Sequence, residues 1–269
     1  MTIQALKCEM CGGAIAFPHG NPSPICPYCG ASKQVSITLD NQVIQPDEML
    51  DFWISEDEAD QSFREFASSS FWYPKDIRNA DLELKRMYLP AWIFSGDIES
   101  HYCGLIRANS RSGYRPVSGI EKYSFDQILV PSSKAINIQE INAISPFPNK
   151  NFQKLDTSQL QYPYEPSELS ERVAIKLSHD VMRMEHGEIL QHEKNLTKIR
   201  NSAIFENVDG HPALFPIFIG VYRRKDKYYR IVINGCTAKL SGNAPFDWVK
   251  LLIILLVFAS IIGLVIALQ

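Results

Sequence analysis

Four of the six cysteines lie near the N-terminus as two C-x-x-C pairs, CEMC at Cys8–Cys11 and CPYC at Cys26–Cys29. Two thiolates at this spacing can occupy one edge of the tetrahedron that zinc prefers, so two pairs supply a full set of four ligands. A glycine follows each pair, and glycine tolerates the positive φ that such tight turns often need. We therefore predict one bound zinc ion (Zn2+), with Cys8, Cys11, Cys26 and Cys29 as its ligands.

The chemistry expected of this site is structural. Four thiolates leave no coordination position for water, whereas catalytic zinc keeps one open. A redox role for a C-x-x-C pair is the alternative, but neither pair begins a helix in a βαβ pattern. The runs AIAF (14–17) and QVSITL (34–39) predict short strands, so residues 1–40 are predicted to form a zinc ribbon. Metal binding, about 10–16 kcal/mol in zinc-finger peptides, would stabilise so small a unit.

Charge argues against a nucleic-acid partner. The formal net charge is −3, and Lys7 and Lys33 are the only basic residues among the first 35. Zinc ribbons that bind nucleic acid need several basic side chains to neutralise phosphates. The ribbon is therefore expected to contact protein or to be purely structural, with nucleic-acid binding as the alternative.

An apolar segment without charge, Leu251–Leu268, lies at the other end of the chain. As a helix it would be about 27 Å long, just sufficient for the hydrocarbon core of a bilayer, and Trp248 suits a membrane interface. We predict a transmembrane anchor over 246–269, with a buried core helix as the alternative. Basic residues precede the segment and none follows it. This pattern predicts a single-pass, tail-anchored protein of the inner membrane with its N-terminus in the cytoplasm and the lipid bilayer as a partner.

Between the two ends, residues 41–245 are predicted to form an α+β body. Ser55 and Glu58 form a capping-box pattern that predicts a helix over about 56–67. A second helix is predicted from near Pro166 to about residue 185 or beyond. Helical spacing marks its expected buried stripe, which consists of Leu169, Val173, Leu177, Val181 and Met184.

Aromatic and β-branched runs predict strands within 87–108 and 122–131, and an antiparallel pair over 214–222 and 228–233. Asn234-Gly235 is expected to form a two-residue type I′ hairpin. The turn between the paired strands carries a basic cluster. These residues are predicted to be either a solvated turn or a membrane-proximal contact with anionic headgroups: Arg223, Arg224, Lys225 and Lys227.

Candidate catalytic residues are few. His179, His186 and His192 fall on or near the second helix with several glutamates, but the run HGEILQHE contains no HExxH motif. An exposed polar face is the preferred interpretation, and a metal or acid–base site the alternative. Cys103 and Cys236 are expected to be small buried side chains. Since no G-x-S-x-G, P-loop or G-x-G-x-x-G motif occurs, we expect no catalytic residues and no enzyme.

Longer stretches of the chain resemble a known family. They are CxxCGG and CPYCG, FWISEDEADQSF with WYPKDI, YLPAWIF, HYCG, FDQILVP, ISPF with YPYEPSEL, and LFPIFIGVYRRKDKYYRIVINGCTAKLSG before the apolar C-terminal segment. With these residues the chain resembles a bacterial family of zinc-ribbon membrane proteins, labelled primosomal-protein-N′-like or TFIIB-type zinc-ribbon-containing. The family's last motif is more often NGQTGK, whereas this chain has NGCTAK, with Ala238 in place of the second glycine.

The resemblance implies a membrane-anchored adaptor, and relatives of this kind look to be associated with phage-shock and band-7 proteins in envelope stress or membrane maintenance. The expected fold is α+β, with a zinc ribbon (1–40), a body of antiparallel strands and two main helices (41–245) and a transmembrane anchor (246–269). The expected function is an adaptor that recruits cytoplasmic proteins to the inner face of the membrane. A membrane-tethered nucleic-acid-binding protein is the alternative.

Overall fold

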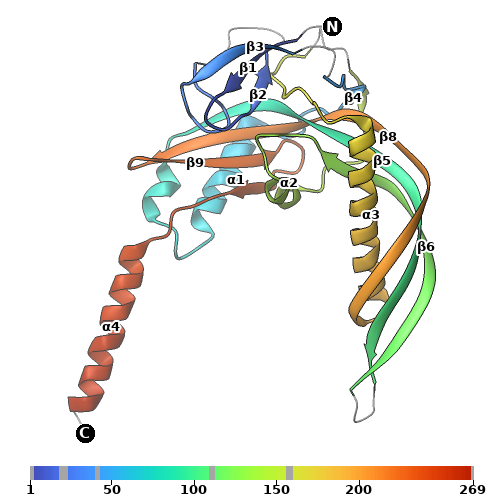
Figure 1. The fold of residues 1–269 in the computed structure, drawn as a ribbon. Coiled ribbons are helices and arrows are strands. Elements are labelled where there is room, and N and C mark those ends of the chain that lie inside the picture. The colour runs from blue at the N-terminus through green and yellow to red at the C-terminus, as the bar shows by residue number, and fades with distance from the viewer. Residues whose placement is uncertain (1–2, 18–23, 40–42, 109–112, 156–159, 268–269) are drawn as a thin grey trace.

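The computed structural model describes residues 3–17, 24–39, 43–108, 113–155 and 160–267, except for the side chains of 263–265 and 267. These residues form a mixed α/β fold in which a small sheet lies at one end of a much larger, strongly curved one (Figure 1). The small sheet is antiparallel with the order β2-β1-β3. Its strands are β1 (Ile3–Cys8), β2 (Ala14–Ala16) and β3 (Gln34–Leu39), which confirms the two strands predicted in the ribbon.

The large sheet is built on two long strands, β5 and β8, which pair antiparallel over nearly their whole length. β6 pairs with β5, and β9 pairs with β8 on one side and β10 on the other. The long strands confirm the strand predictions for this region. The strands are β4 (Glu48–Met49), β5 (Leu82–Arg107), β6 (Tyr114–Pro131), β7 (Gln153–Lys154), β8 (Leu196–Arg224), β9 (Lys227–Asn234) and β10 (Leu240–Gly242).

Four α-helices and one 3-10 helix accompany the sheets in the described residues. They are α1 (Glu56–Ser68), η1 (Lys75–Asn79), α2 (Ile138–Ile144), α3 (Glu171–Glu193) and α4 (Trp248–Ala267). The capping box predicted for α1 is present: the Glu58 N–H donates to the Ser55 hydroxyl, and the Ser55 N–H donates to the Glu58 carboxylate at 2.7 Å. Both the helix and its start are therefore confirmed.

The alternation of side chains along β5 separates two cores. Odd-numbered residues such as Leu89 and Ile93 pack with Ile141 of α2, whereas Trp92 and Phe94 pack with Met182 of α3. Successive side chains of a strand point to opposite faces of the sheet. α2 and α3 therefore cover opposite faces.

The second helix differs from its prediction. It begins at Glu171, with Ser170 as its N-cap, and not near Pro166. Of the expected buried stripe, Leu169 and Val181 are partly buried against the core, but the prediction is wrong for Val173, Leu177 and Met184, which are exposed. The buried face instead combines the small residues Ala174, Ser178 and Gly187 with the larger Met182, His186 and Leu190. Small side chains let the helix axis lie close to the curved sheet, which hydrophobic periodicity does not report.

The Asn234-Gly235 hairpin prediction is wrong. β9 ends at Asn234, β10 begins at Leu240, and the Asn234 N–H donates to the carbonyl of Lys239 at 2.8 Å. The Asn234 side chain is fully buried; it accepts from the N–H of Cys236 and donates to the carbonyl of Ile144 in α2. The buried Asn234 side chain therefore stabilises a loop that is longer than a two-residue hairpin. Ala238 in this loop has φ +59°.

The transmembrane anchor predicted over 246–269 is also wrong. No helix in the described part of the chain is long and apolar enough to cross a membrane. The predictions that depended on the anchor are corrected with it: a fold class with a membrane-spanning helix, a tail-anchored topology and a single-pass location in the inner membrane.

Candidate metal centre

Two matching turns present the four cysteines. In the first, the Gly12 N–H donates to the Cys8 carbonyl at 2.9 Å, and the Cys8 N–H donates to the Gly13 carbonyl. The second repeats the pattern, since the Gly30 N–H donates to the Cys26 carbonyl at 2.8 Å. Gly12 and Gly30 have φ values of +77° and +74°, which residues with a Cβ rarely adopt. The glycine after each C-x-x-C pair is thus required by the backbone of the turn.

The four thiols converge on one point. The Sγ atoms of Cys8 and Cys29 lie 3.6 Å apart and those of Cys11 and Cys26 lie 3.7 Å apart. All four Sγ atoms lie within 4.8 Å of one another. A zinc tetrahedron with bonds of about 2.3 Å has sulfur–sulfur edges of about 3.8 Å, whereas a disulfide would need about 2.05 Å. The spacing therefore fits a metal ion such as zinc, and all four cysteines are free thiols.

Burial and hydrogen bonding act on these thiols in opposite directions. Burial raises the pKa of Cys11 to about 11, and it also raises the pKa of Cys26. For Cys8, burial is outweighed by hydrogen bonds from the backbone of Cys11 and Met10, which lower its pKa to about 7. A cation at the centre would favour all four thiolates, because metal coordination deprotonates thiols.

Tyr28, within the second C-x-x-C pair, anchors this centre to the body of the protein. Its side chain is fully buried, and its hydroxyl donates to the Glu165 carboxylate at 2.7 Å. Glu165 also accepts from the Ser133 hydroxyl at 2.6 Å and from the Lys134 N–H at 2.8 Å. Burial raises the pKa of Glu165, and these hydrogen bonds oppose the shift. Neither Tyr28 nor Glu165 was predicted from the sequence, in which the only signal is an acidic residue between aromatic and proline residues in YPYEPSEL.

The backbone around Glu165 joins the small sheet to the large one. Tyr164 exchanges two hydrogen bonds with Ala16 of β2, at 2.8 and 3.1 Å. On the other side, the Tyr88 N–H donates to the Pro163 carbonyl, and the Glu165 N–H donates to the Tyr88 carbonyl. The ribbon therefore continues the large sheet through one short extended segment.

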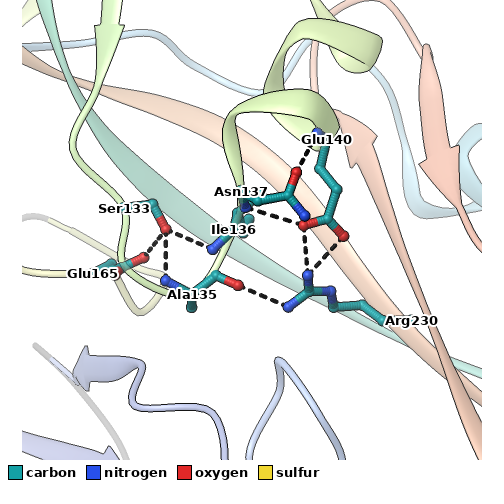
Figure 2. A network of polar contacts seen from close by, with 7 residues as sticks. All are labelled: Ser133, Ala135, Ile136, Asn137, Glu140, Glu165 and Arg230. Atoms are coloured by element: carbon teal, nitrogen blue, oxygen red, sulfur yellow. Dashed lines mark hydrogen bonds and ion pairs between the residues drawn. The ribbon is translucent and has the colours of Figure 1, made fainter.

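The connection from β6 to α2 is held by a polar network shown in Figure 2. The Ser133 hydroxyl donates to Glu165 and accepts from the Ala135 N–H at 3.2 Å. Arg230 of β9 donates to the Ala135 carbonyl at 2.8 Å and to both carboxylate oxygens of Glu140 at 2.6 Å. Glu140 belongs to the first turn of α2. A chain of contacts thus leads from Tyr28, beside the thiols, to the start of α2.

The histidines of α3 do not form a site. His186 is buried and its Nδ1 lies 2.8 Å from the Ser100 hydroxyl, while His179 stacks on Phe205 with a centroid distance of 4.1 Å. Burial lowers the pKa of both histidines. Only His192 is exposed as predicted. Within the described residues, the four cysteines are the only group of three or more metal-ligating side chains.

The two remaining thiols, Cys103 and Cys236, differ in their exposure. Cys236 is buried, as predicted, with its sulfur 3.4 Å from the Asp51 carbonyl oxygen. Cys103 is exposed, so its predicted burial is wrong. Ser100, three residues earlier on β5, faces His186 of α3, so the Cys103 side chain points to the opposite face of the sheet.

The basic cluster lies on the turn between β8 and β9, as predicted. Arg224 pairs with Asp76 at 3.0 Å and Arg223 with Asp226 at 3.6 Å. Lys225 and Lys227 are exposed, and Lys225 has φ +54°. The solvated-turn interpretation fits these contacts. The headgroup contact assumed a neighbouring membrane anchor and is withdrawn with it.

No family model matches the chain, and no solved structure matches it. The chain is similar to "Uncharacterized protein YdjG" of Bacillus subtilis (strain 168), with 22% identity over 227 residues. The match covers 76% of this chain and 65% of the relative, so the chain spans less than two thirds of the relative's length. The cysteine cluster is consistent with a zinc ribbon, but no family match supports the membrane or primosomal label.

Proposed function

We propose that this protein is an adaptor that binds a protein partner and whose ribbon is held in place by Zn2+. Four thiolates would complete the coordination of the ion and leave no position for water or substrate, so its role would be structural. The observation that carries the proposal is the set of four Sγ atoms within 4.8 Å of one another. The ion would act on the rest of the molecule through Tyr28 and Glu165.

The body of the protein supports an adaptor role over an enzymatic one. Among the described residues, the buried carboxylate Glu165 accepts from three donors, and the buried histidine His186 contacts the Ser100 hydroxyl. Groups held in this way stabilise the fold and are not free to transfer protons. The described surface instead carries apolar side chains on α3 and α2, among them Met184 and Ile138, which are 60% and 54% exposed.

Metal content is the first test. Purified full-length protein is expected to contain about one zinc per chain by elemental analysis. Cys8→Ser is expected to lose the ion, and Cys103→Ser, which changes an exposed thiol outside the centre, is expected to keep it. A wild-type protein without zinc, or equal metal content in both variants, would contradict the proposed centre.

Partner binding is the second test. Crosslinking followed by mass spectrometry should identify a protein that crosslinks to wild type and to Cys103→Ser but not to Cys8→Ser. If wild type crosslinks to no protein above background, the adaptor proposal fails. If a nucleic acid is captured in a salt-dependent manner instead, the alternative function expected from the ribbon replaces it.

A further inference from the structure

One edge of the large sheet is open near α2 and α3. β6 pairs with β5 on one side, and no described strand pairs with its other side over Gln127–Pro131. An unpaired edge presents backbone N–H and C=O groups that can bond to another chain. Pro131, which has no N–H, ends this edge.

α2 and α3 both lie next to this edge, on opposite faces of the sheet. Leu129 packs toward the core that contains Ile141 of α2, whereas Ile128 and Val130 pack with the core that contains Met182 of α3. Figure 1 shows the end of β6 between α2 and α3. An added strand would therefore have one face toward α2 and the other toward α3.

A groove of about 520 Å³ follows the edge, within the size range of binding pockets. We call it the β6 groove; its lining includes Leu129 and Pro131 of β6, Ile138 and Ile141 of α2, and Val181 and Met184 of α3. Val181 and Met184 belong to the apolar stripe of α3 whose burial the sequence predicts. Along this stripe Val173, Leu177 and Met184 are 48%, 40% and 60% exposed. The chain itself therefore leaves this apolar surface largely uncovered.

The charged side chains among the described lining residues of the β6 groove are all negative. Glu185 and Glu188, which follow Met184 on the same face of α3, line it, and no Lys or Arg is among its described lining residues. Burial, and then the nearby Glu188, raises the pKa of Glu185, as expected for two carboxylates that lack a cation. Lys239 contacts one lining residue, because its ammonium group donates to the carbonyl of Ser145.

We propose that the β6 groove binds an extended segment of a protein partner, which pairs with the edge of β6 and places Lys or Arg beside Glu185 and Glu188. Strand addition draws affinity from main-chain hydrogen bonds and specificity from alternate side chains. The segment would alternate apolar residues, directed at α2, with basic residues directed at α3. This inference rests on the proposed adaptor function and identifies its binding site.

A second copy of the chain is the competing occupant. Pairing of two β6 edges would bring two copies of the Glu185–Glu188 pair close together without a compensating cation in the groove. Like charges placed opposite each other destabilise strand pairing. The charge of the groove therefore favours a basic segment of another protein.

Fluorescence anisotropy with zinc-loaded full-length protein tests this proposal. The probes are two labelled peptides, one of alternating valine and lysine and one of alternating valine and glutamate. The lysine peptide is expected to bind at least about tenfold more tightly, and added salt should reduce the difference. Glu185→Gln combined with Glu188→Gln should weaken lysine-peptide binding by about tenfold. Glu171→Gln combined with Glu193→Gln changes the same charge on α3 outside the groove and should have no effect.

Hydrogen exchange locates the bound peptide. The outward-facing amides of Gln127 and Leu129 are expected to gain protection when the lysine peptide binds. Equal binding of the two peptides, no binding, or protection confined to the helices would overturn the proposal. Protection that rises with protein concentration without peptide would also overturn it, in favour of a second copy. If these experiments fail while the crosslinked partner contacts another surface, the adaptor function stands and only the β6 groove is excluded.

Discussion

The Tyr28 hydroxyl donates a hydrogen bond of 2.7 Å to the carboxylate of Glu165, although 137 positions separate the two residues in the sequence. Tyr28 lies between two cysteines of the metal centre, and Glu165 lies in the segment that joins the two sheets. Both side chains are almost completely buried. This contact therefore connects the position of the ribbon to the body of the fold.

Removal of the Tyr28 hydroxyl should destabilise the protein. In Tyr28→Phe the buried Glu165 carboxylate keeps its bonds from Ser133 and Lys134 but loses one donor. A lost partner of a buried charged group costs about 1–3 kcal/mol. Urea unfolding should show this decrease in the free energy of unfolding. Tyr114→Phe, at an exposed tyrosine, is the control and should change it little. Equal stability of the two variants would contradict a structural role for this hydrogen bond.

The metal centre and the long strands could be predicted because their signals are local. A C-x-x-C pair with its following glycine specifies a turn within a few residues, and the geometry at Cys8 and Gly12 depends on little else. The capping box of Ser55 and Glu58 is equally local. β5 was detectable because both faces of Met87–Phe94 are buried, and such a strand requires the continuous run of apolar and aromatic residues that the sequence shows there.

The remaining features depend on contacts between distant segments. The buried face of α3 is set by how closely the helix approaches the sheet, which selects Ala174 and Gly187 over the larger Leu177. Asn234-Gly235 has the composition of a tight hairpin. The Asn234 side chain is buried instead, because it donates to the carbonyl of Ile144 in α2. No local sequence pattern marks Glu165, because its donors come from two distant parts of the chain, Tyr28 and the neighbouring residues Ser133 and Lys134.

Arg230 should be required for the position of α2. It joins the Ala135 carbonyl to the Glu140 carboxylate, and both charged side chains are mostly buried. Arg230→Lys keeps the charge but loses the planar group that reaches both acceptors. We expect a loss of about 1–3 kcal/mol in the free energy of unfolding, measured with urea. Arg223→Lys, at the exposed turn, is the matched control. If both substitutions have the same small effect, the bridge does not hold α2.

Removal of the metal should loosen the ribbon before the large sheet. Coordination contributes much of the folding free energy of small zinc units. After chelation, hydrogen exchange should accelerate at the amides of Ala16 and Tyr164, which join the two sheets. The amides of Ile231 and Val232, which are fully buried on β9 between β8 and β10, should remain protected. Cys26→Ser should reproduce the effect without chelator, whereas Cys103→Ser should behave like wild type. Unchanged exchange at Ala16 would show that the ribbon is held without metal.

The conformation of Ala238 predicts a stabilising substitution. This residue has φ +59°, where the contact between Cβ and backbone costs an L-residue about 1–2 kcal/mol. Glycine removes that cost but adds freedom to the unfolded chain, worth about 0.4–1 kcal/mol. Ala238→Gly should therefore raise the free energy of unfolding by about 0.5–1 kcal/mol in urea titrations.

Ala80, with φ −63°, provides the matched control for that substitution. Ala80→Gly relieves no strain, so only the added freedom of the unfolded chain counts and stability should fall. Both substitutions exchange alanine for glycine. Changes of opposite sign in the free energy of unfolding would therefore be due to the backbone strain at Ala238. If Ala238→Gly also lowers stability, contacts of the Ala238 methyl group outweigh its strain. The loop that Asn234 closes would then depend on that side chain and not only on its backbone.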